Sequence, residues 1–590
     1  MTSSTSAATP ATLSAPLSAR NDFNSVYAAF AHSAAVTPDK PFLCITSDVA
    51  AAYDIAAGEI SYQSALNTVH MLRDAYLAAG YGRPQDRPHR IGLMVDNRPS
   101  YFFHWFALNA LGASVVPVNA EFTAAEQAYL LEHSEACLLI SSVCHLDTAA
   151  RAVAASGVNI PIVVDAENEF APSLPRLPSP DRSKNAADER DLTPTNECAV
   201  LFTSGSTGTP KACLLSNEYF LDMGYWYRDI GGLCSLTFAT ERLITPLPLT
   251  HMNAMATSAM AMIVTSGCLV QLDRFHPKTW WTSVRESGAT MCHYLGVMPA
   301  ILLQLDESKA DTDHALKFGF GAGVNPAHHA KFELRFGFPL LEAWAMTETG
   351  SGGCVIANHE PRHVGTSCFG KPDPAHVIYR LIDESGQDAD QGELQVKRAG
   401  DNPRKSFFTA YYKNKEATEQ GWADGWWHTG DVVKRNPDGT LSFVDRSKNI
   451  IRRSGENIAA LEVEAVLSRY LGLRMVAVTP APDEIRGEEV MACVILDDTA
   501  EASEATALSL FKHAATELAY YKTPGYVAFL TSMPLTATQK PKRNEIKRLA
   551  RRLIDAAQDD AQDDGTSGDD PDLKQSMVFD LRARKKKMKA

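Results

Sequence analysis

The sequence contains no C-x-x-C pair, although eleven cysteines are spread over its 590 residues. This absence excludes the common zinc and dithiol spacings, and scattered cysteines are typical of reduced thiols in a cytosol-like compartment. No apolar run approaches the roughly 20 residues that a membrane-spanning helix needs. The sequence therefore predicts a soluble cytoplasmic protein with no membrane span.

An excess of basic charge is also missing. The 56 Lys and Arg residues are outnumbered by 70 Asp and Glu, which gives a formal net charge of −14. Such a chain repels phosphate backbones, so we expect no nucleic-acid partner, whereas nucleotides are bound by local loops and stay possible ligands. The composition is 45% hydrophobic and 21% charged, as in globular proteins. At about 150 residues per domain, this length indicates more than one domain.

The two ends of the chain differ in composition from the rest. Residues 1–21 are rich in Ser, Thr, Ala and Pro, which predicts a disordered leader; the alternative is a transit peptide, but those are usually richer in Arg. Residues 551–590 contain eight aspartates between Asp555 and Asp572, and then six Lys or Arg among the last nine positions. Blocks of like charge are usually solvated, so we expect a flexible tail, with contact to an acidic surface as the alternative.

Alternating strand and helix signals fill the first third of the chain. Apolar runs predict strands at 91–95, 114–118 and 137–141, and helix signals predict helices at 97–112 and 124–133. A β-α-β-α order implies a parallel sheet covered by helices on both faces. We therefore predict an α/β fold with mostly parallel sheets in a large, multi-layer N-terminal domain.

The pattern changes after residue 446. One face of a predicted helix carries Val463, Val466, Leu467 and Tyr470. Further elements are expected as strands at 475–478, 490–496 and 526–530 and as a helix at 508–518. The sequence therefore predicts a large domain at 22–446 and a small α+β domain at 447–550, with a cleft between them as the natural place for chemistry.

A loop rich in hydroxyl groups follows the strand-like run at 199–202. Its sequence is TSGSTGTPK, in which glycines let backbone N–H groups turn toward an anion and hydroxyls and a lysine add donors. It is not a Walker loop, and a Ser/Gly surface turn is the alternative. The candidate phosphate-binding residues are Thr203, Ser204, Gly205, Ser206, Thr207, Gly208 and Lys211.

Two other apparent motifs fail. GAGVNP at 321–326 begins like a dinucleotide fingerprint but has proline where the last glycine belongs. GTSCF at 365–369 begins like a nucleophile elbow but has Phe369 where glycine is needed. Neither a Rossmann dehydrogenase nor a serine hydrolase is supported.

Seven segments in register carry a specific resemblance. They are TSGSTGTPK (203–211), PLPLTHMNAM (246–255), GAGVNP (321–326), AWAMTET (343–349), WWHTGD (426–431), FVDRSKNIIRRSGENI (443–458) and PLTATQKPKR (534–543). In this order and spacing, over residues 22 to 550, the chain resembles the adenylate-forming superfamily of acyl-CoA synthetases, carrier-protein adenylation domains and firefly luciferase. The segment at 443–458 is most similar to the carnitine/crotonobetaine-CoA ligase branch.

The resemblance implies a reaction in two halves and a small domain that moves on a hinge. A carboxylic acid attacks the α-phosphate of ATP to give an acyl-adenylate and pyrophosphate, and a thiol, usually that of coenzyme A, then displaces AMP. Because two anions must meet in the first half, cationic groups and Mg²⁺ are needed where charge develops. ATP, Mg²⁺ and coenzyme A are therefore the expected cofactors and co-substrates, with a homodimer left open.

The resemblance also implies roles for individual residues around the nucleotide. The hydroxyl-rich loop would hold the β- and γ-phosphates. Thr347 and Glu348 match a Thr-Glu pair that contacts the α-phosphate and ligates Mg²⁺, and glutamate oxygen suits this ion. Trp344 would lie against adenine, although an isolated tryptophan is more often part of a core. The residues expected on the other side of the base are Gly321, Ala322 and Gly323.

Ribose, hinge and catalytic positions follow in the same way. Asp431 would accept hydrogen bonds from both ribose hydroxyls, which suits a carboxylate, and Arg446 would support ribose and phosphate. Lys448 matches the hinge position. Lys540 matches the lysine that bridges the carboxylate and the α-phosphate. Without the resemblance, these charges would be interpreted as turn residues or solvated surface groups.

The acyl and thiol sides of the site are expected near two further positions. His251 matches a gate beside the carboxylate, and Gly455 in the loop 453–457 would let pantetheine pass close to the backbone. The sequence departs from the family pattern at Gln539, Ala345 and Ala212. We therefore expect the local loop geometry at these positions to differ from that of the family. Candidate acyl-pocket residues are Tyr225, Trp226, His251, Met252, Met255, Tyr294, Gly296 and Val297.

Three functions remain open from the sequence. The favoured one is an AMP-forming acyl-CoA ligase. The alternatives are an adenylating enzyme that loads a carrier protein, disfavoured by the lack of a carrier domain in this chain, and a catalytically silent nucleotide-binding relative. The acid is open as well: aromatic rings suit a trimethylammonium group, but a short or medium aliphatic acid or an aromatic acid is the broader expectation.

Overall fold

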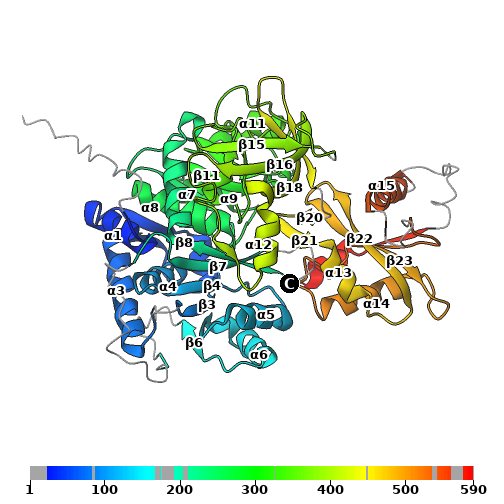
Figure 1. The fold of residues 1–590 in the computed structure, drawn as a ribbon, viewed down its shortest axis with the longest axis horizontal. Helices are drawn as coiled ribbons and strands as arrows, with labels where there is room; N and C mark the ends of the chain where they lie inside the picture. The colour runs from blue at the N-terminus through cyan, green and yellow to red at the C-terminus, as the bar shows by residue number, and fades with distance from the viewer. Residues whose placement is uncertain are drawn as a thin grey trace, which may run out of the picture.

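The computed structural model describes residues 23–82, 87–165, 174–175, 192–203, 210–324, 326–383, 385–446, 450–534, 541, 543–559 and 576–588. These residues form a large lobe and a smaller lobe that lie side by side (Figure 1). The large lobe contains the elements up to β19, and the small lobe contains the elements from β20 onward.

One sheet of the large lobe has seven strands in the order β17-β8-β7-β4-β3-β5-β6. Its bounds are β3 (Arg90–Met94), β4 (Ser114–Pro117), β5 (Leu138–Ser142), β6 (Ile162–Asp165), β7 (Glu197–Thr203), β8 (Lys211–Ser216) and β17 (Ala410–Tyr411). The strands from β7 to β6 are parallel, and only β8 and β17 are antiparallel to their neighbours. The three strands predicted for the first third are confirmed, as are their helices α4 (Pro99–Ala110) and α5 (Ala124–Ser134).

A second sheet of the large lobe has eight strands in the order β14-β13-β12-β11-β9-β10-β1-β2. Its bounds are β1 (Pro41–Ile45), β2 (Gly58–Ser61), β9 (Arg242–Thr245), β10 (Cys268–Gln271), β11 (Met291–Leu295), β12 (Phe318–Ala322), β13 (Leu340–Trp344) and β14 (Val355–Ile356). The inner strands are parallel. Because the carboxyl ends of parallel strands meet at one edge, Leu295, Ala322 and Trp344 end their strands at the same edge, where ligands bind in open α/β sheets.

The main hydrophobic core lies between these two sheets. It combines buried side chains of both sheets with those of α1 (Val26–Val36), α4, α7 (Asn217–Asp229) and α8 (Ala259–Thr265). The remaining α-helices of the large lobe are α2 (Ser47–Tyr53), α3 (Tyr62–Ala79), α6 (Leu146–Ser156), α9 (Trp280–Ser287), α10 (Val297–Leu302), α11 (Pro326–Phe336) and α12 (Lys415–Gly421). The mostly parallel, multi-layer α/β architecture predicted from the sequence is confirmed.

A four-stranded antiparallel sheet completes the large lobe and leads to the small one. Its strands are β15 (Val377–Ile382), β16 (Gln391–Arg398), β18 (Trp427–Arg435) and β19 (Leu441–Arg446). Strand β19 ends at Arg446, two residues before the predicted hinge at Lys448, which lies outside the described residues. The sheet therefore carries the chain from the body of the large lobe to the junction.

The small lobe has its own sheet and its own core. Its elements are β20 (Ile450–Arg453), β21 (Glu456–Ala459), α13 (Ala460–Leu467), β22 (Leu473–Asp483), β23 (Gly487–Leu496), α14 (Glu504–Ala515), β24 (Tyr526–Phe529) and α15 (Arg543–Asp559). The predicted α+β pattern is confirmed, but the first helix ends at Leu467 rather than at Tyr470. The amide of Tyr470 bonds the Leu467 carbonyl three residues earlier, so the apolar face continues into a tight turn.

The described parts of residues 551–590 differ from the flexible tail that we expected. Residues 551–559 belong to α15, and residues 576–588 form β25 (Met577–Asp580) and α17 (Arg582–Met588). Strand β25 pairs antiparallel with β24 and extends the sheet by one strand. The like-charge rule fails here because buried acidic partners from earlier in the chain neutralise part of the basic segment, as described below.

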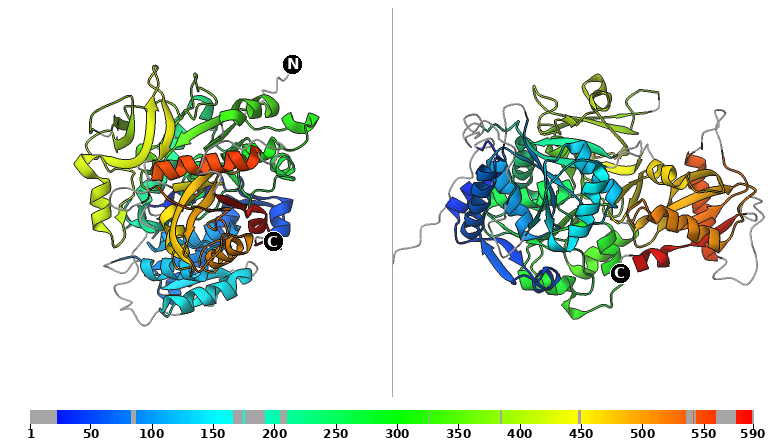
Figure 2. Two further views of the ribbon diagram at one scale, coloured as in Figure 1. Left: turned by 90° about the vertical axis from the view of Figure 1, so that its right-hand side faces the viewer. Right: turned by 90° about the horizontal axis from the view of Figure 1, so that it is seen from below.

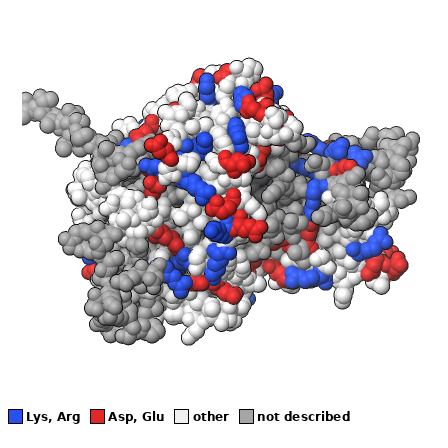
Figure 3. Space-filling view, in the orientation of Figure 1, with Lys and Arg blue, Asp and Glu red and all other residues white. Residues whose placement is uncertain are grey.

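Three general features complete the fold. On the face drawn in Figure 3, Lys and Arg are interspersed with Asp and Glu. Among the described residues, no helix combines the length and the apolar character that crossing a bilayer requires. All eleven cysteines are free.

Candidate active site between the two lobes

The turn after β13 brings a carboxylate to the entrance of the hydroxyl-rich loop. Glu348 is buried, accepts a hydrogen bond from the Tyr411 hydroxyl at 2.7 Å, and lies 3.5 Å from the hydroxyl of Thr203. Lys211, on the far side of the loop, places its ammonium 4.6 Å from the centre of the Tyr411 ring. Thr347 lies half-buried in the same turn as Glu348. The structure thus brings together four of the predicted phosphate- and metal-site residues.

Tyr411 is a member of this group that sequence reasoning missed. Burial raises the pKa of its hydroxyl, and the Glu348 carboxylate raises it further, so the hydroxyl stays protonated and donates to Glu348. Its strand, β17, pairs with β8 at the edge of the seven-stranded sheet, about 200 residues after the loop it supports. Nothing local to Tyr411 signals this role. Positions 204–209 of the loop lie outside the described residues.

Two residues of the predicted adenosine site also meet. The Trp344 indole N–H donates to Asp431 Oδ2 at 2.9 Å, and both residues are buried. The Thr429 hydroxyl accepts from the Asp431 amide at 3.0 Å, which fixes the backbone of Asp431. Arg446 is paired with Asp431 in the β18–β19 register, so the two predicted ribose residues are cross-strand neighbours at the level of the backbone.

A buried glutamate holds the glycine turn that follows β12. The amides of Gly323 and Val324 donate to the two carboxylate oxygens of Glu342 at 2.9 and 2.8 Å. At Gly321 a Cβ would lie 2.3 Å from the Tyr294 carbonyl oxygen, so only glycine fits that close approach. Glu342 was missed from the sequence, although a single carboxylate within the apolar strand Leu340–Trp344 is the signal that could have found it.

The raised pKa of the buried Glu342 carboxyl can be tested through the pH dependence of the free energy of unfolding. Burial raises its pKa to about 7 despite the two N–H donors, so between pH 4.5 and 7 the folded protein binds more protons than the unfolded chain. The free energy of unfolding must then fall as pH rises through this interval. We expect Glu342→Gln to remove about 2–3 kcal/mol of that fall, measured by urea unfolding at pH 5 and pH 8.

The matched control for this experiment is Glu132→Gln, which replaces an exposed carboxylate on α5. It should leave the difference between pH 5 and pH 8 as in the wild type. An unchanged pH slope in Glu342→Gln would contradict the assignment of a protonated, buried carboxyl beneath the glycine turn.

The small lobe presents a tight turn to the large lobe. Strands β20 and β21 form a hairpin whose central residues, Ser454 and Gly455, both have positive φ, at 51° and 88°. A Cβ at Gly455 would lie 2.1 Å from Leu295 Cδ1, at the end of β11. Gly455 therefore packs directly on the residue that follows Tyr294 of the candidate acyl pocket.

His251 meets the same hairpin. Its Nε2 lies 3.8 Å from Glu456 Oε2. Burial lowers the pKa of His251, but the Glu456 side chain outweighs burial, so the net shift is upward. The predicted gate residue thus contacts the predicted thiol loop across the junction, and Glu456 and Leu295 are two contacts that the sequence motifs did not reveal.

The other candidate pocket residues lie around this contact. Tyr225, Trp226, Met255 and Tyr294 are buried, and His251, Met252, Gly296 and Val297 are partly buried. At Gly296 a Cβ would lie 1.7 Å from the Gly323 carbonyl oxygen. The pocket segment and the glycine turn are therefore in direct backbone contact, which joins the candidate acyl and nucleotide sites.

A second contact between the lobes centres on Lys522. Its buried ammonium lies 2.7 Å from Glu126 Oε1 of the large lobe and 2.7 Å from Glu462 Oε1 of the small lobe. The Thr123 hydroxyl also donates to the Glu517 carbonyl at 3.0 Å across the junction. Ion pairing and hydrogen bonding thus fix this relative position of the lobes.

The segment that carries Lys540 lies outside the described residues, but the helix that follows it is described. Helix α15 begins at Arg543 and lies on the outer side of the small lobe, facing away from the large lobe (Figure 2). The lobes are therefore arranged with the Gly455 turn, and not α15, toward the strand ends of the large lobe.

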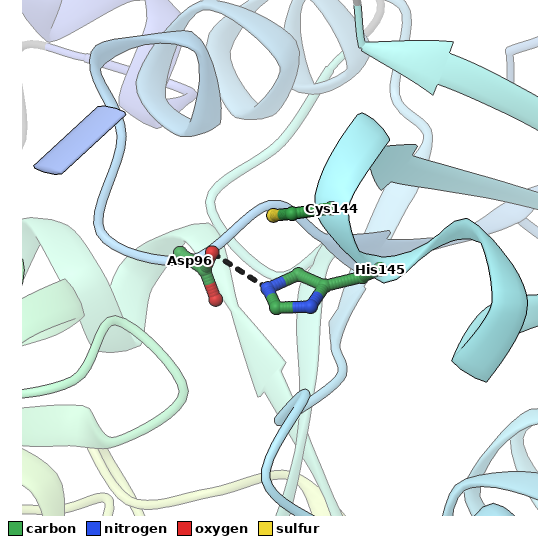
Figure 4. Close-up of side chains that lie close together, drawn as sticks. All are labelled: Asp96, Cys144 and His145. Atoms are coloured by element: carbon green, nitrogen blue, oxygen red, sulfur yellow. Dashed lines mark hydrogen bonds and ion pairs between the residues drawn. The ribbon is translucent and has the colours of Figure 1, made fainter. Parts of the chain in front are cut away.

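A separate cluster lies outside this site. Asp96, Cys144 and His145 approach one another beside β3, and His145 Nε2 lies 2.7 Å from Asp96 Oδ2 (Figure 4). The Arg98 guanidinium lies 4.0 Å from Cys144 Sγ. Because a cation already faces the sulfur, we interpret the cluster as a histidine–aspartate pair rather than as a metal site.

Comparison with known proteins gives a consistent result. The sequence model of the AMP-binding enzyme family matches residues 30–402, and that of the AMP-binding enzyme C-terminal domain matches residues 462–540. Crotonobetaine/carnitine–CoA ligase of Citrobacter koseri is 27% identical over 501 residues, which cover 83% of this chain and 93% of that protein. Sulfoacetate–CoA ligase of Cupriavidus necator is 28% identical over 527 residues, covering 88% and 97%.

Solved structures share the fold. Amide bond synthetase McbA from Marinactinospora thermotolerans superimposes with a TM-score of 0.73 at 22% identity, covering 88% of this chain and 99% of that one. A double mutant of o-succinylbenzoate CoA synthetase (MenE) from Bacillus subtilis gives a TM-score of 0.72 at 20% identity, covering 88% and 98%. At this level of identity the structures support the architecture alone.

Proposed function

The chain belongs to the family of AMP-binding enzymes, and from that premise we propose that it is an ATP-dependent, AMP-forming acyl-CoA ligase. It activates a carboxylic acid as an acyl-adenylate with release of pyrophosphate and then transfers the acyl group to coenzyme A. The observation that carries the proposal is the packing of Gly455 against Leu295, which brings the predicted thiol loop to the wall of the acyl pocket.

The first half-reaction draws on the strand ends of the large lobe. Glu348 and the Thr203 hydroxyl offer oxygen ligands only, a donor set that suits Mg²⁺ and its retained waters. When bound, Mg²⁺ would neutralise charge on the phosphates. Tyr411 holds the Glu348 carboxylate in place, and Lys211 adds positive charge where the phosphates would lie.

The adenosine part of ATP is assigned to the adjoining pair and turn. Asp431 would accept from the ribose hydroxyls, and its bond from the Trp344 indole restrains the carboxylate for that task. The glycine turn that Glu342 holds would lie against the base, because small residues allow close approach there.

The second half-reaction uses the lobe arrangement described above. The Gly455 turn would deliver the coenzyme A thiol beside His251 and Leu295, whereas Lys540 and α15 would approach only after rotation of the small lobe about Lys448. The small lobe would thus present first its Lys540 face and then its Gly455 face to the large lobe, which is a hinge motion. The contacts of Gly455 and His251 support the thioester-forming arrangement.

For the carboxylic acid substrate we propose a chemical class rather than a single compound. The buried aromatic residues Tyr225, Trp226 and Tyr294 suit an apolar aliphatic or aromatic acid and equally a trimethylammonium group. One curated relative acts on crotonobetaine or carnitine and another on sulfoacetate, so relatives at this distance differ in substrate.

The free cysteines support the cytoplasmic location predicted from the sequence.

The test is incubation with ATP, Mg²⁺ and a panel of carboxylic acids, with and without coenzyme A. We expect AMP release that depends on coenzyme A, together with a thioester product identified by mass spectrometry. Pyrophosphate release without a thioester would indicate carrier-protein loading instead. No release of AMP or pyrophosphate with any acid would indicate a catalytically silent relative.

A further inference from the structure

Residues 576–588 form an addition to the small lobe beyond the region that the family's C-terminal domain model matches, which ends at residue 540. Strand β25 extends the sheet beside β24, and Leu581 is buried in the core of the lobe. Phe579 packs edge-on against Phe529 with their ring centres 5.8 Å apart. The segment is therefore an integral part of the lobe.

The segment inserts a lysine into a buried ion network. Lys585 Nζ donates to Glu489 Oε1 at 2.6 Å and to the Tyr521 carbonyl at 3.2 Å. The other cation on Glu489 is Arg453, whose Nε lies 2.8 Å from both carboxylate oxygens. The side chains of Lys585, Glu489 and Arg453 are 1%, 0% and 5% exposed. Two cations therefore share one carboxylate without access to water.

Arg453 connects this network to the turn that carries Gly455. It is the last residue of β20, and the next amide, of Ser454, donates to the Arg486 carbonyl at 3.1 Å. Residues 576–588 hold that second contact as well, because Arg582 lies 3.0 Å from Asp483, whose side chain accepts from the Arg486 amide. Both anchors of the turn thus depend on this segment.

We propose that residues 576–588 position the Gly455 turn for the thioester-forming half-reaction, with Lys585 as the positioning residue that acts through Glu489 and Arg453. The proposal rests on the proposed acyl-CoA ligase function. Its physical basis is that the buried Glu489 carboxylate has one orientation when Lys585, Arg453 and the Val490 amide at 2.9 Å all hold it, whereas loss of Lys585 frees one side of the carboxylate and lets the turn move. Small displacements at a reacting centre have large effects on rate.

The surroundings of Lys585 make this effect depend on pH. Burial lowers its pKa to about 7; Glu489 opposes the shift, and the nearby cations Arg453 and Arg486 reinforce it. Tyr521 is uncharged and contacts the Lys585 ammonium through its backbone carbonyl. Below pH 7 the ammonium binds Glu489 as a full ion pair, and above pH 7 a neutral amine binds it more weakly. The effect of removing Lys585 should therefore be largest below pH 7.

The test compares Lys585→Met with Arg584→Met, a matched change at an exposed neighbour on α17. Each half-reaction is measured separately: pyrophosphate exchange for adenylation, and coenzyme A consumption from a synthetic acyl-adenylate of the acid that the panel identifies. We expect Lys585→Met to slow the second step about tenfold or more and to leave the first within about twofold. The ratio of the second-step rate in Lys585→Met to that in the wild type should approach one as pH rises through 7. Arg584→Met should have wild-type rates in both steps.

Hydrogen exchange of the 450–459 hairpin gives a readout without any ligand. We expect faster exchange in Lys585→Met and in Glu489→Gln, the second variant, and no change in Arg584→Met. Equal loss in both half-reactions, or unchanged exchange and rates in both variants, would overturn the proposal. A wild-type protein that forms no adenylate with any acid would instead overturn the proposed function, and that outcome is seen before any variant is made.

Discussion

Lys540→Ala is expected to reduce acyl-adenylate formation by about 10²–10³-fold, the loss typical of removing one group that stabilises charge in a transition state. The ammonium would lie between two anions, the carboxylate and the α-phosphate, where attraction is strongest because water is excluded. Since α15, the helix that follows Lys540 in the chain, lies on the outer side of the small lobe, we expect Lys540 to have no part in the thioester step. That step, started from synthetic acyl-adenylate, should stay within a few-fold of wild type.

Pyrophosphate exchange and single-turnover thioester formation measure the two halves for this variant. Lys512→Ala is the control, because Lys512 is an exposed lysine on α14 of the same lobe. Equal losses in both half-reactions would show that Lys540 supports the small lobe as a whole, and the assigned role would then be wrong.

Gly455→Trp is expected to slow the thioester step and to spare adenylation, the reverse of the effect expected for Lys540→Ala. The residue has φ of +88°, which costs a side-chain-bearing residue about 1–2 kcal/mol, and its Cβ would lie 2.1 Å from Leu295 Cδ1. An indole cannot fit between the hairpin and β11, so the lobes cannot close in the thioester-forming arrangement. We expect thioester formation to fall by about 100-fold or more and adenylation to stay within a few-fold.

The control for this variant is Gly386→Trp. Gly386 also has a positive φ, of +81°, but a Cβ there would meet nothing within 4 Å. The control therefore carries the same backbone strain in an exposed turn and separates strain from steric blockage. Thioester formation that survives in Gly455→Trp would refute the proposed thiol passage.

Local patterns predicted much of the fold and the contiguous parts of the site. The helix α4 begins at Pro99, where proline is favoured at a helix start, and the strand β7 leads into the hydroxyl-rich loop as its apolar run predicted. Trp344 and Asp431 lie in separate motifs, and the structure joins them by a hydrogen bond. These elements were predictable because each motif contains its own turn and strand signals.

The residues that sequence reasoning missed depend on contacts between distant segments. Tyr411 reaches Glu348 across 63 positions, and Lys585 reaches Glu489 across 96. A run of like charges predicts a solvated tail only if no distant counter-ion is buried beneath it. Glu489 is such a counter-ion, and no local feature of the sequence reveals its position.

The pairing of Lys522 has a consequence for the energetics of turnover. Two carboxylates, Glu126 and Glu462, share one ammonium at this contact, and burial together with the neighbouring Glu126 raises the pKa of Glu462. In the proposed rotation of the small lobe, Glu126 would regain water while Lys522 keeps Glu462, so no cation would be stranded in an apolar interior. If the small lobe rotates as proposed, this ion pair is a contact that must be released and remade in every catalytic cycle.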